Sequence, residues 1–191
     1  MEHAVTLVVT DDLRRNRLTV FFRLLLAIPH YVWLYLWGIA AAVVTLIAWF
    51  AALFTKRVPD GLHRFLARYV RYQVHVYSYV VLVADPYPGF GGEETTYPVD
   101  LRIAPPQEQG RLGVFFRLLL AIPALVVSYV MNYLMGIVAF FAWFACLFLG
   151  RMPEGMRNLL AFTIRYHAQT QAYVSLVTSD YPSFNVGLDA S

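Results

Sequence analysis

The sequence predicts an all-α membrane protein made of two tandem copies of one unit, from its composition, two long uncharged stretches and an internal repeat. Of its 191 residues, 59% are hydrophobic and 14% are charged, whereas soluble domains have about 45–50% apolar and about 25% charged residues. Residues 24–54 and 118–148 carry no formal charge over 31 positions each. A transmembrane helix needs about 20 apolar residues, so each stretch is long enough to cross a bilayer.

The repeat is clearest in a ten-residue segment that occurs twice without change. Residues 20–29, Val-Phe-Phe-Arg-Leu-Leu-Leu-Ala-Ile-Pro, return as residues 114–123, at an offset of 94. The motifs Ala-Trp-Phe-Ala and Arg-x-Pro-x-Gly recur at the same offset. A fixed offset indicates a duplicated unit. We therefore divide the chain into a first membrane repeat with linker, 1–96, and a second membrane repeat, 97–191.

Each copy is predicted to place a short strand before its long stretch and a second helix after it. Residues 3–10 and 97–104 alternate apolar and polar side chains, which is typical of a half-buried strand. The second helices are predicted at residues 62–84 and 156–178, after an Arg-x-Pro-Asp/Glu-Gly turn. Their many polar side chains would be costly in hydrocarbon, so we expect interfacial amphipathic helices that lie on the membrane.

The long stretches are predicted to be transmembrane helices with a kink at Pro29 and at Pro123, because proline removes a backbone donor from the helix. Arg23 and Arg117 precede these prolines, and we expect their guanidinium groups to snorkel to the depth of the lipid phosphates. A helical hairpin within each stretch is the alternative, although only Gly38 interrupts the first stretch near its middle.

Small residues recur at three- and four-residue steps along both long stretches. Such a stripe allows helices to approach closely in a membrane. We expect it to pack the two spans of one chain together, with oligomerisation as the alternative. The stripe consists of Gly38, Ala41, Ala48, Ala52, Gly136, Ala139 and Ala142.

Two polar residues, His30 and Asn132, lie within or near the spans. A polar group at membrane depth is a functional candidate, but the counterparts of these two residues are Ala124 and Gly38, so the duplication did not keep them. We expect His30 to lie at headgroup depth and Asn132 to form an interhelical hydrogen bond.

Both copies keep an arginine just after the long stretch and another in the second helix, namely Arg57, Arg71, Arg151 and Arg165. A guanidinium binds phosphate with two parallel hydrogen bonds, so these are candidate ligands for lipid headgroups. The alternative is local. The arginine of each turn would pair with the acidic residue of the same turn, or cap the last carbonyls of the span.

The charge balance limits the partners and leaves the topology open. A net charge of +3 is too small for a nucleic-acid reader and fits anionic lipids. If each copy crosses once, the copies are antiparallel about an axis in the membrane plane, and if the second helices also cross, the copies are parallel. The basic residues divide seven to eight in either case, so they do not orient the protein.

The sequence contains no recognisable catalytic or metal-binding pattern. The five histidines lack metal-ligand spacing, and Cys146 is the only cysteine, which excludes an internal disulfide. We find no phosphate loop and no nucleophile elbow. We therefore expect no cofactor, no metal ion and no catalytic residue.

Taken together, the motifs resemble one family. The first copy contains Arg-Leu-Leu-Leu-Ala-Ile-Pro-His at 23–30, Ala-Trp-Phe-Ala-x-Leu-Phe-Thr-x-Arg-x-Pro-x-Gly at 48–61, and Asp-x-Tyr-Pro-x-Phe at 85–90. With Arg71, this pattern resembles the bacterial membrane family described as domain of unknown function 4389, here in two tandem copies. The resemblance implies a protein of the bacterial inner membrane, and it transfers no functional residue.

Three functions are compatible with these observations. We expect a non-enzymatic integral membrane module that associates with itself, with lipid or with another membrane protein. A component of an oligomeric channel or transporter is the first alternative, since two to four spans are few for a lone carrier. A lipid-modifying enzyme is the second, and it is disfavoured because no acid, base or nucleophile recurs in both copies.

Overall fold

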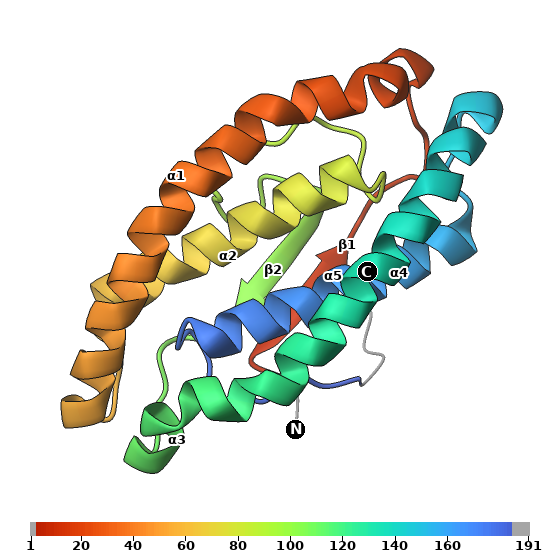
Figure 1. The fold of residues 1–191 in the computed structure, drawn as a ribbon. Coiled ribbons are helices and arrows are strands. Elements are labelled where there is room, and N and C mark those ends of the chain that lie inside the picture. Colours follow the sequence, from red (N-terminus) through yellow and green to blue (C-terminus); the bar gives the residue numbers. More distant parts are fainter. Residues whose placement is uncertain (1–2, 185–191) are drawn as a thin grey trace.

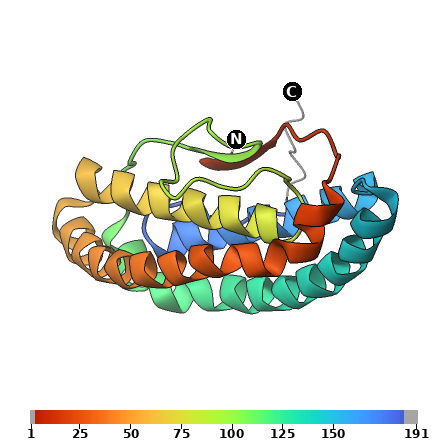
Figure 2. The same cartoon turned by 90° about the horizontal axis from the view of Figure 1, so that it is seen from above.

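Three layers make up the fold that the computed structural model describes for residues 3–184 (Figures 1 and 2). A two-stranded sheet covers two middle helices, and these cover two long outer helices (Figure 2). The elements in chain order are β1 (Val5–Val9), α1 (Arg17–Thr55), α2 (Asp60–Val80), β2 (Val99–Ile103), α3 (Arg111–Phe115), α4 (Arg117–Leu149) and α5 (Glu154–Val174).

The two predicted strands are confirmed, and they pair with each other across the repeats. β1 and β2 are antiparallel, with Leu7 opposite Leu101 and Val5 opposite Ile103. The alternation of the sequence turns Val5, Leu7 and Leu101 into the core, where they are buried. Because Leu101 is the counterpart of Leu7 in the repeat, a pseudo-twofold axis that relates the two copies passes through this pair.

The predicted long helices are confirmed as single helices, and the hairpin alternative is wrong. α1 runs over 39 residues and α4 over 33, and both continue through their internal proline. Figure 2 shows both helices bowed along their length. The sharper interruption lies before α4, where Phe116 separates the one-turn α3 from it.

The ends of the long helices follow from local sequence. The side chain of Asn16 accepts a hydrogen bond from the Leu18 amide and caps the start of α1. At the other ends, Lys56 and Gly150 adopt the left-handed conformation that closes a helix. Gly150 suits this backbone because glycine lacks a Cβ.

The second helices, α2 and α5, form the middle layer, so their position differs from the predicted one at the membrane surface. Their apolar side chains, such as Val70 in α2 and Ile164 in α5, are buried in the protein core. Their polar side chains bond to the sheet. The Arg71 guanidinium donates to the Leu101 carbonyl, and the Gln169 amide donates to the Val5 carbonyl at 3.1 Å. The polar residues that suggested water or headgroups are thus satisfied by backbone carbonyls.

At Gly38 the small-residue stripe brings α1 close to α2, the helix that follows it, and α1 and α4 also contact each other. Ala41, Ala48, Ala52 and Ala142 belong to the core beneath the outer layer. A Cβ on Gly38 would lie 2.9 Å from the Tyr69 hydroxyl oxygen of α2. The second helices already occupy this face of the long helices. Gly136 and Ala139 lie toward its exposed edge.

Two tryptophans join the outer helices near their tips. The Trp49 indole donates to the Val114 carbonyl at 2.8 Å, and the Trp143 indole donates to the Val20 carbonyl at 3.0 Å. The two hydrogen bonds are equivalent under the repeat offset. They set α1 and α4 antiparallel, with the end of each beside the beginning of the other copy's helical segment (Figure 1).

Candidate membrane surface and arginine sites

The outer faces of α1 and α4 form a broad apolar surface, which we call the apolar face. In the most hydrophobic windows of α1 and α4, only 17% and 22% of the residues are buried inside the protein. Both helices are long and apolar enough to cross a membrane. Large exposed members of the face are Leu18, Leu36, Ile47 and Phe54 on α1, and Leu118, Ile122, Ile137 and Phe148 on α4.

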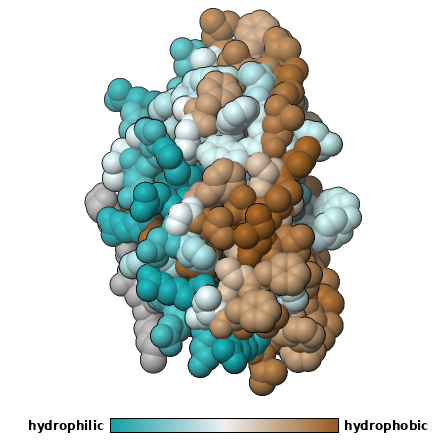
Figure 3. Space-filling view, turned by 90° about the vertical axis from the view of Figure 1, so that its left-hand side faces the viewer, coloured by the Kyte–Doolittle hydropathy of each residue, from teal (hydrophilic) through white to brown (hydrophobic). Residues whose placement is uncertain are grey.

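Hydrophobic and hydrophilic residues lie on opposite sides of the molecule. Figure 3 shows hydrophobic residues gathered on the side of the outer helices and hydrophilic residues on the opposite side. The sequence of α1 has no charged residue after Arg23, and that of α4 has none after Arg117. Soluble monomers rarely expose apolar patches larger than a few hundred Å². Large exposed apolar patches are typical of protein or membrane interaction sites.

Basic residues border the apolar face at both tips. The Arg17 guanidinium donates to the Phe148 carbonyl at 2.9 Å, and its counterpart Arg111 donates to the Phe54 carbonyl at 3.2 Å. Each arginine thus caps the last turn of the opposite long helix, where carbonyls lack helical partners and the dipole favours cations. Lys56, Arg57 and Arg151 follow the same helix ends and are exposed.

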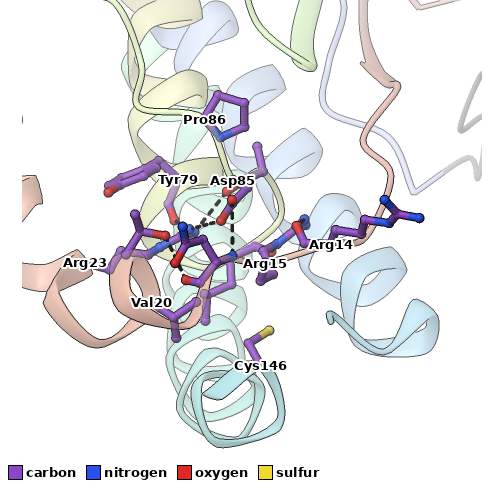
Figure 4. A network of polar contacts seen from close by, with 12 residues as sticks. Arg14, Arg15, Val20, Arg23, Tyr79, Asp85, Pro86 and Cys146 are labelled. Atoms are coloured by element: carbon purple, nitrogen blue, oxygen red, sulfur yellow. Dashed lines mark hydrogen bonds and ion pairs between the residues drawn. The ribbon is translucent and has the colours of Figure 1, made fainter. Parts of the chain in front are cut away.

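Arg23 is buried inside the protein, and this corrects the prediction that it snorkels to lipid phosphate. Its side chain is 1% exposed. It lies among the labelled side chains of Arg15, Tyr79 and Asp85 (Figure 4). One terminal nitrogen donates to the carbonyls of Tyr79 and Ala84, and the other contacts the Asp85 carboxylate at 2.7 Å. The guanidinium also lies over the Tyr79 ring, 4.4 Å from its centroid. Arg23 thus donates to two carbonyls at the end of α2, of which the Tyr79 carbonyl also accepts from the Leu82 amide at 3.2 Å.

Arg15, which is also buried, extends this network. It donates to the carbonyls of Leu82 and Val83 and contacts Asp11 at 2.6 Å. Leu82 has a positive φ of 68°, which turns its carbonyl out of the helical direction. Two arginines thus hold the turn that ends α2 against the start of α1.

Arg117 occupies the equivalent position in the second copy, but its side-chain partner is neutral. It is also buried, lies 4.3 Å from the Tyr173 ring centroid and donates to the Thr178 carbonyl at 3.0 Å. In place of a carboxylate it contacts the Gln109 side-chain oxygen. Ser179 stands where the first copy has Asp85. The arginine, the aromatic ring and the carbonyl recur in both copies, and the carboxylate does not.

Two of the four candidate headgroup arginines, Arg57 and Arg71, line a single cleft of about 630 Å³. Arg57 is exposed and contacts Asp60 at 3.1 Å, which is the local pairing that the sequence allowed as the alternative. Arg71 is buried and contacts Glu94 at 2.8 Å and Asp100 at 3.2 Å. Carboxylates therefore compensate both guanidinium groups of this cleft.

The other two arginines lie in the second copy, away from that cleft. Arg151 is exposed, and its backbone forms a bridge with Arg14. The Glu154 carboxylate lies 3.8 Å from Arg157, so the acidic residue of this turn contacts a different arginine. Arg165 is buried, with its guanidinium 5.3 Å from the Phe162 ring centroid. The structure thus separates an exposed pair, Arg57 and Arg151, from a buried pair.

His30 is buried among aromatic side chains of the protein. It does not reach out toward lipid headgroups, where the sequence led us to expect it. Its Nδ1 lies 2.6 Å from the Tyr72 hydroxyl oxygen, and its ring centroid lies 4.5 Å from those of Tyr87 and Phe90. Asn132 is exposed on α4 and makes no interhelical hydrogen bond within residues 3–184. The sequence could not place His30, because its contacts come from α2 and from the loop after it, more than 40 positions along the chain.

A smaller recess of about 330 Å³ lies between α1 and the middle helices. Its lining includes the amides of Gln73 and Gln171 and the hydroxyl of Tyr69, and the Gln73 amide donates to that hydroxyl at 3.1 Å. Between α2 and α5, the ring centroids of Tyr77 and His167 lie 5.4 Å apart, and burial lowers the pKa of His167. The residues that line the recess do not combine a nucleophile with a base.

Within the described part of the chain, no group of three histidine, cysteine or acidic residues is placed to hold a metal ion. The titratable groups that do lie close together, such as Arg71, His75 and Asp100, are bound to one another and to backbone. These contacts join α2 to β2 and so stabilise the fold.

The fold and its surfaces define a class, a tandem-repeat helical protein with two exposed candidate membrane helices. The chain belongs to the family described as Domain of unknown function (DUF4389), whose model matches residues 17–91 and again residues 111–185. This confirms the family and its two tandem copies. Comparison with curated proteins and with solved structures finds no match.

Proposed function

We propose that this protein is a non-enzymatic integral membrane module of the bacterial inner membrane, which associates through its apolar face with lipid, with itself or with another membrane protein. The observation that carries the proposal is the apolar face itself. Its side chains are exposed along two helices of 39 and 33 residues, whereas the polar side chains bond to one another on the other side. Hydrocarbon is the environment that removes such a surface from water.

The exposed basic residues at the tips support association with anionic lipid. Arg57 and Arg151 follow the two long helices and lie at the border of the apolar face. Each basic residue near an anionic membrane surface contributes about 1 kcal/mol of attraction. Arg71 and Arg165 are buried, so within this proposal they support the fold, and headgroups contact the exposed pair.

The absence of recurring reactive groups supports a non-enzymatic role. The polar groups that both copies keep include Arg23 with Arg117, Tyr79 with Tyr173 and the two tryptophans, and these bind backbone carbonyls or pack as rings against the arginines. A catalytic site needs a nucleophile or a base within reach of a substrate.

Flotation with liposomes tests the proposal. The purified full chain, transferred from detergent to vesicles of phosphatidylcholine and phosphatidylglycerol, should float with the lipid and should aggregate when detergent is removed without lipid. A variant with Leu18→Glu, Leu36→Glu and Phe54→Glu should float far less, since these three side chains are exposed on the apolar face. Arg102→Glu, exposed on the sheet, is the matched control. A monodisperse native chain in plain buffer would refute the proposal.

Retention of anionic lipid tests the basic border. Arg57→Gln together with Arg151→Gln should reduce the phosphatidylglycerol that co-purifies with the protein, as measured by native mass spectrometry from nanodiscs. The same spectra report oligomer size and any bound protein partner. Equal retention by the variant and the native chain would exclude the headgroup role. Selective ion flux through reconstituted vesicles would favour the channel alternative over the module.

A further inference from the structure

We infer that the protein is monotopic: α1 and α4 lie flat in one leaflet, with their axes along the membrane plane, and neither helix crosses the bilayer. This inference rests on the proposed association with a membrane, and it specifies how the two long helices are oriented relative to the bilayer. The partner is the hydrocarbon and headgroup region of a single leaflet. Three features of the structure lead to it.

The first feature is the position of the sheet opposite the middle of the long helices. The axis that relates the copies passes through Leu7 and Leu101 in the sheet. The equivalent hydrogen bonds of Trp49 and Trp143 join the tips of the outer layer in the same symmetric way, so the axis also passes between the midpoints of α1 and α4. Figure 2 shows the sheet over the central part of the helical layers.

This position is incompatible with a crossing orientation. If α1 crossed the bilayer, its midpoint and the sheet would share the depth of the bilayer centre. Arg102, which is exposed, directly follows the central residue Leu101. Glu94, whose side chain is 72% exposed, contacts Arg71, and Arg71 donates to the Leu101 carbonyl. Charged groups facing lipid at this depth are strongly disfavoured.

The second feature is that most exposed large hydrophobic side chains of the described residues lie on one side, that of the outer helices. A helix that crosses lipid must offer apolar side chains around the whole protein surface at membrane depth, because hydrocarbon surrounds it. Here the middle helices and the charged sheet side cover the inner faces of α1 and α4 along their length (Figures 2 and 3). The flat orientation places the apolar face in hydrocarbon and the sheet side in water.

The third feature is the combination of helix length and basic tips. At about 1.5 Å per residue, 39 residues span about 58 Å, whereas the hydrocarbon core is about 30 Å thick. Exposed basic residues border both tips, with Arg17 and Arg151 at one and Arg57 and Arg111 at the other. In the flat orientation all four reach the headgroups of the same leaflet. If both tips lie at the same membrane surface, the positive-inside rule does not distinguish them. This explains why the basic residues of the sequence divide almost evenly, seven to eight.

Depth measurements along α1 test the inference. Leu18, Leu36 and Phe54 are 18 residues apart, which is five helical turns, so they point in one direction. They are 67%, 52% and 73% exposed. Each is replaced by a spin-labelled cysteine in a Cys146→Ala background, since alanine stands at the equivalent position 52. In phosphatidylglycerol-containing vesicles, collision rates with oxygen and a nickel chelate report the depth of each label.

The flat orientation predicts the same depth for all three labels and water exposure for a label at Arg102→Cys. A label at Leu36 that is much deeper than the other two would overturn the inference and leave the proposed membrane association intact. Labels shielded without vesicles, together with twice the monomer mass, would identify a second copy as the occupant of the apolar face and would also overturn it. Loss of vesicle binding in the native chain would instead refute the proposed function.

A second measurement leaves the apolar face unchanged. Arg14→Cys and Arg57→Cys flank α1 at its two ends, and both positions are exposed. A membrane-impermeant maleimide added outside cells with a permeabilised outer membrane should react with both cysteines or with neither. After the inner membrane is opened, both should react. Reaction of one alone before opening would show a crossing helix and refute the inference.

Discussion

In both repeats a buried arginine at the start of the long helix binds the turn that follows the second helix, but the charge of its side-chain partner differs. In the first, a buried arginine at the start of α1 bonds to carbonyls of the turn after α2 and to the Asp85 carboxylate. In the second, Arg117 bonds to the matching Thr178 carbonyl and to the side chain of Gln109. The carbonyl and the ring persist in both copies, so closing the turn is the shared role. The carboxylate is an addition of the first copy.

Replacing the buried arginines should give the largest losses of stability, and a larger loss in the first copy than in the second. Arg23→Met removes a donor from the carbonyls of Tyr79 and Ala84 and the ion-pair partner of Asp85. Because this carboxylate is 29% exposed, the loss should not exceed the ~3–5 kcal/mol that breaking a fully buried pair costs. Arg117→Met leaves neutral acceptors only, and each unsatisfied group costs about 1–3 kcal/mol. Thermal unfolding in mild detergent should therefore rank Arg23→Met below Arg117→Met, and both below the native chain.

The matched control for this prediction is Asp85→Ser, which installs the residue of the second copy. Because the second copy has Ser179 at the position of Asp85 and Arg117 forms no ion pair among the described residues, Asp85→Ser should cost less than Arg23→Met. Equal losses for the two variants would mean that the ion pair, and not the closure of the turn, sustains the first copy.

The two tryptophans should give a smaller and symmetric effect. Trp49→Phe and Trp143→Phe each remove one hydrogen bond to a carbonyl of the other copy, which is worth about 1 kcal/mol. Because the bonds are equivalent, the two variants should lose the same amount of stability in the same unfolding assay. Clearly unequal losses would contradict the pseudo-twofold arrangement of the outer layer.

Acidification should destabilise the first repeat through His63, whose counterpart is Arg157. Burial lowers the pKa of His63, and its hydrogen bond to the Val177 carbonyl offsets this only in part. The unfolded histidine has a pKa near 6.5, so below that pH the unfolded chain binds a proton that the folded chain resists. Stability contributed by this group is complete above about pH 6.5 and is lost as the pH falls.

The expected observation is a lower unfolding temperature at pH 5 than at pH 7.5. His63→Gln keeps a donor for the Val177 carbonyl and removes the titration, so its temperature should change less between the two pH values. The same decrease in the variant as in the native chain would assign the effect to other groups.

Two glycines of the small-residue stripe should give the smallest effects, with opposite signs. Gly136→Ala meets no described atom within 4 Å, so it should gain the helix propensity of alanine, about 0.5–1 kcal/mol. Gly38→Ala places its Cβ 2.9 Å from the Tyr69 hydroxyl, and the displaced ring should outweigh the gain. Stabilisation by both variants would show that α1 does not need to approach α2 so closely.

The sequence predicted the elements well because the signals for them are local. Alternation marked β1 and β2, the uncharged stretches marked α1 and α4, and the Arg-x-Pro-x-Gly turns marked the starts of α2 and α5. The duplication was visible from identical residues alone. Each of these features depends on neighbours within a few turns of the chain.

The sequence could not predict which partners satisfy the polar side chains. Arg23 and Asp85 are 62 positions apart, and no periodicity links them. The polar face of α2 suggested a water or headgroup environment, yet Arg71 bonds to β2. The recurrence of both tryptophans within the repeated Ala-Trp-Phe-Ala motif was a usable signal, and it marked the contacts that join the two copies.

The register of the sheet has a consequence for the history of the chain. Since Leu7 lies opposite its own counterpart, a strand of this kind is complementary to itself when it meets an identical strand in the antiparallel direction. A gene that encoded a single unit would therefore have given a symmetric homodimer with the same three layers. Fusion of the two genes made the halves free to diverge, and Asp85 and His30 record that divergence.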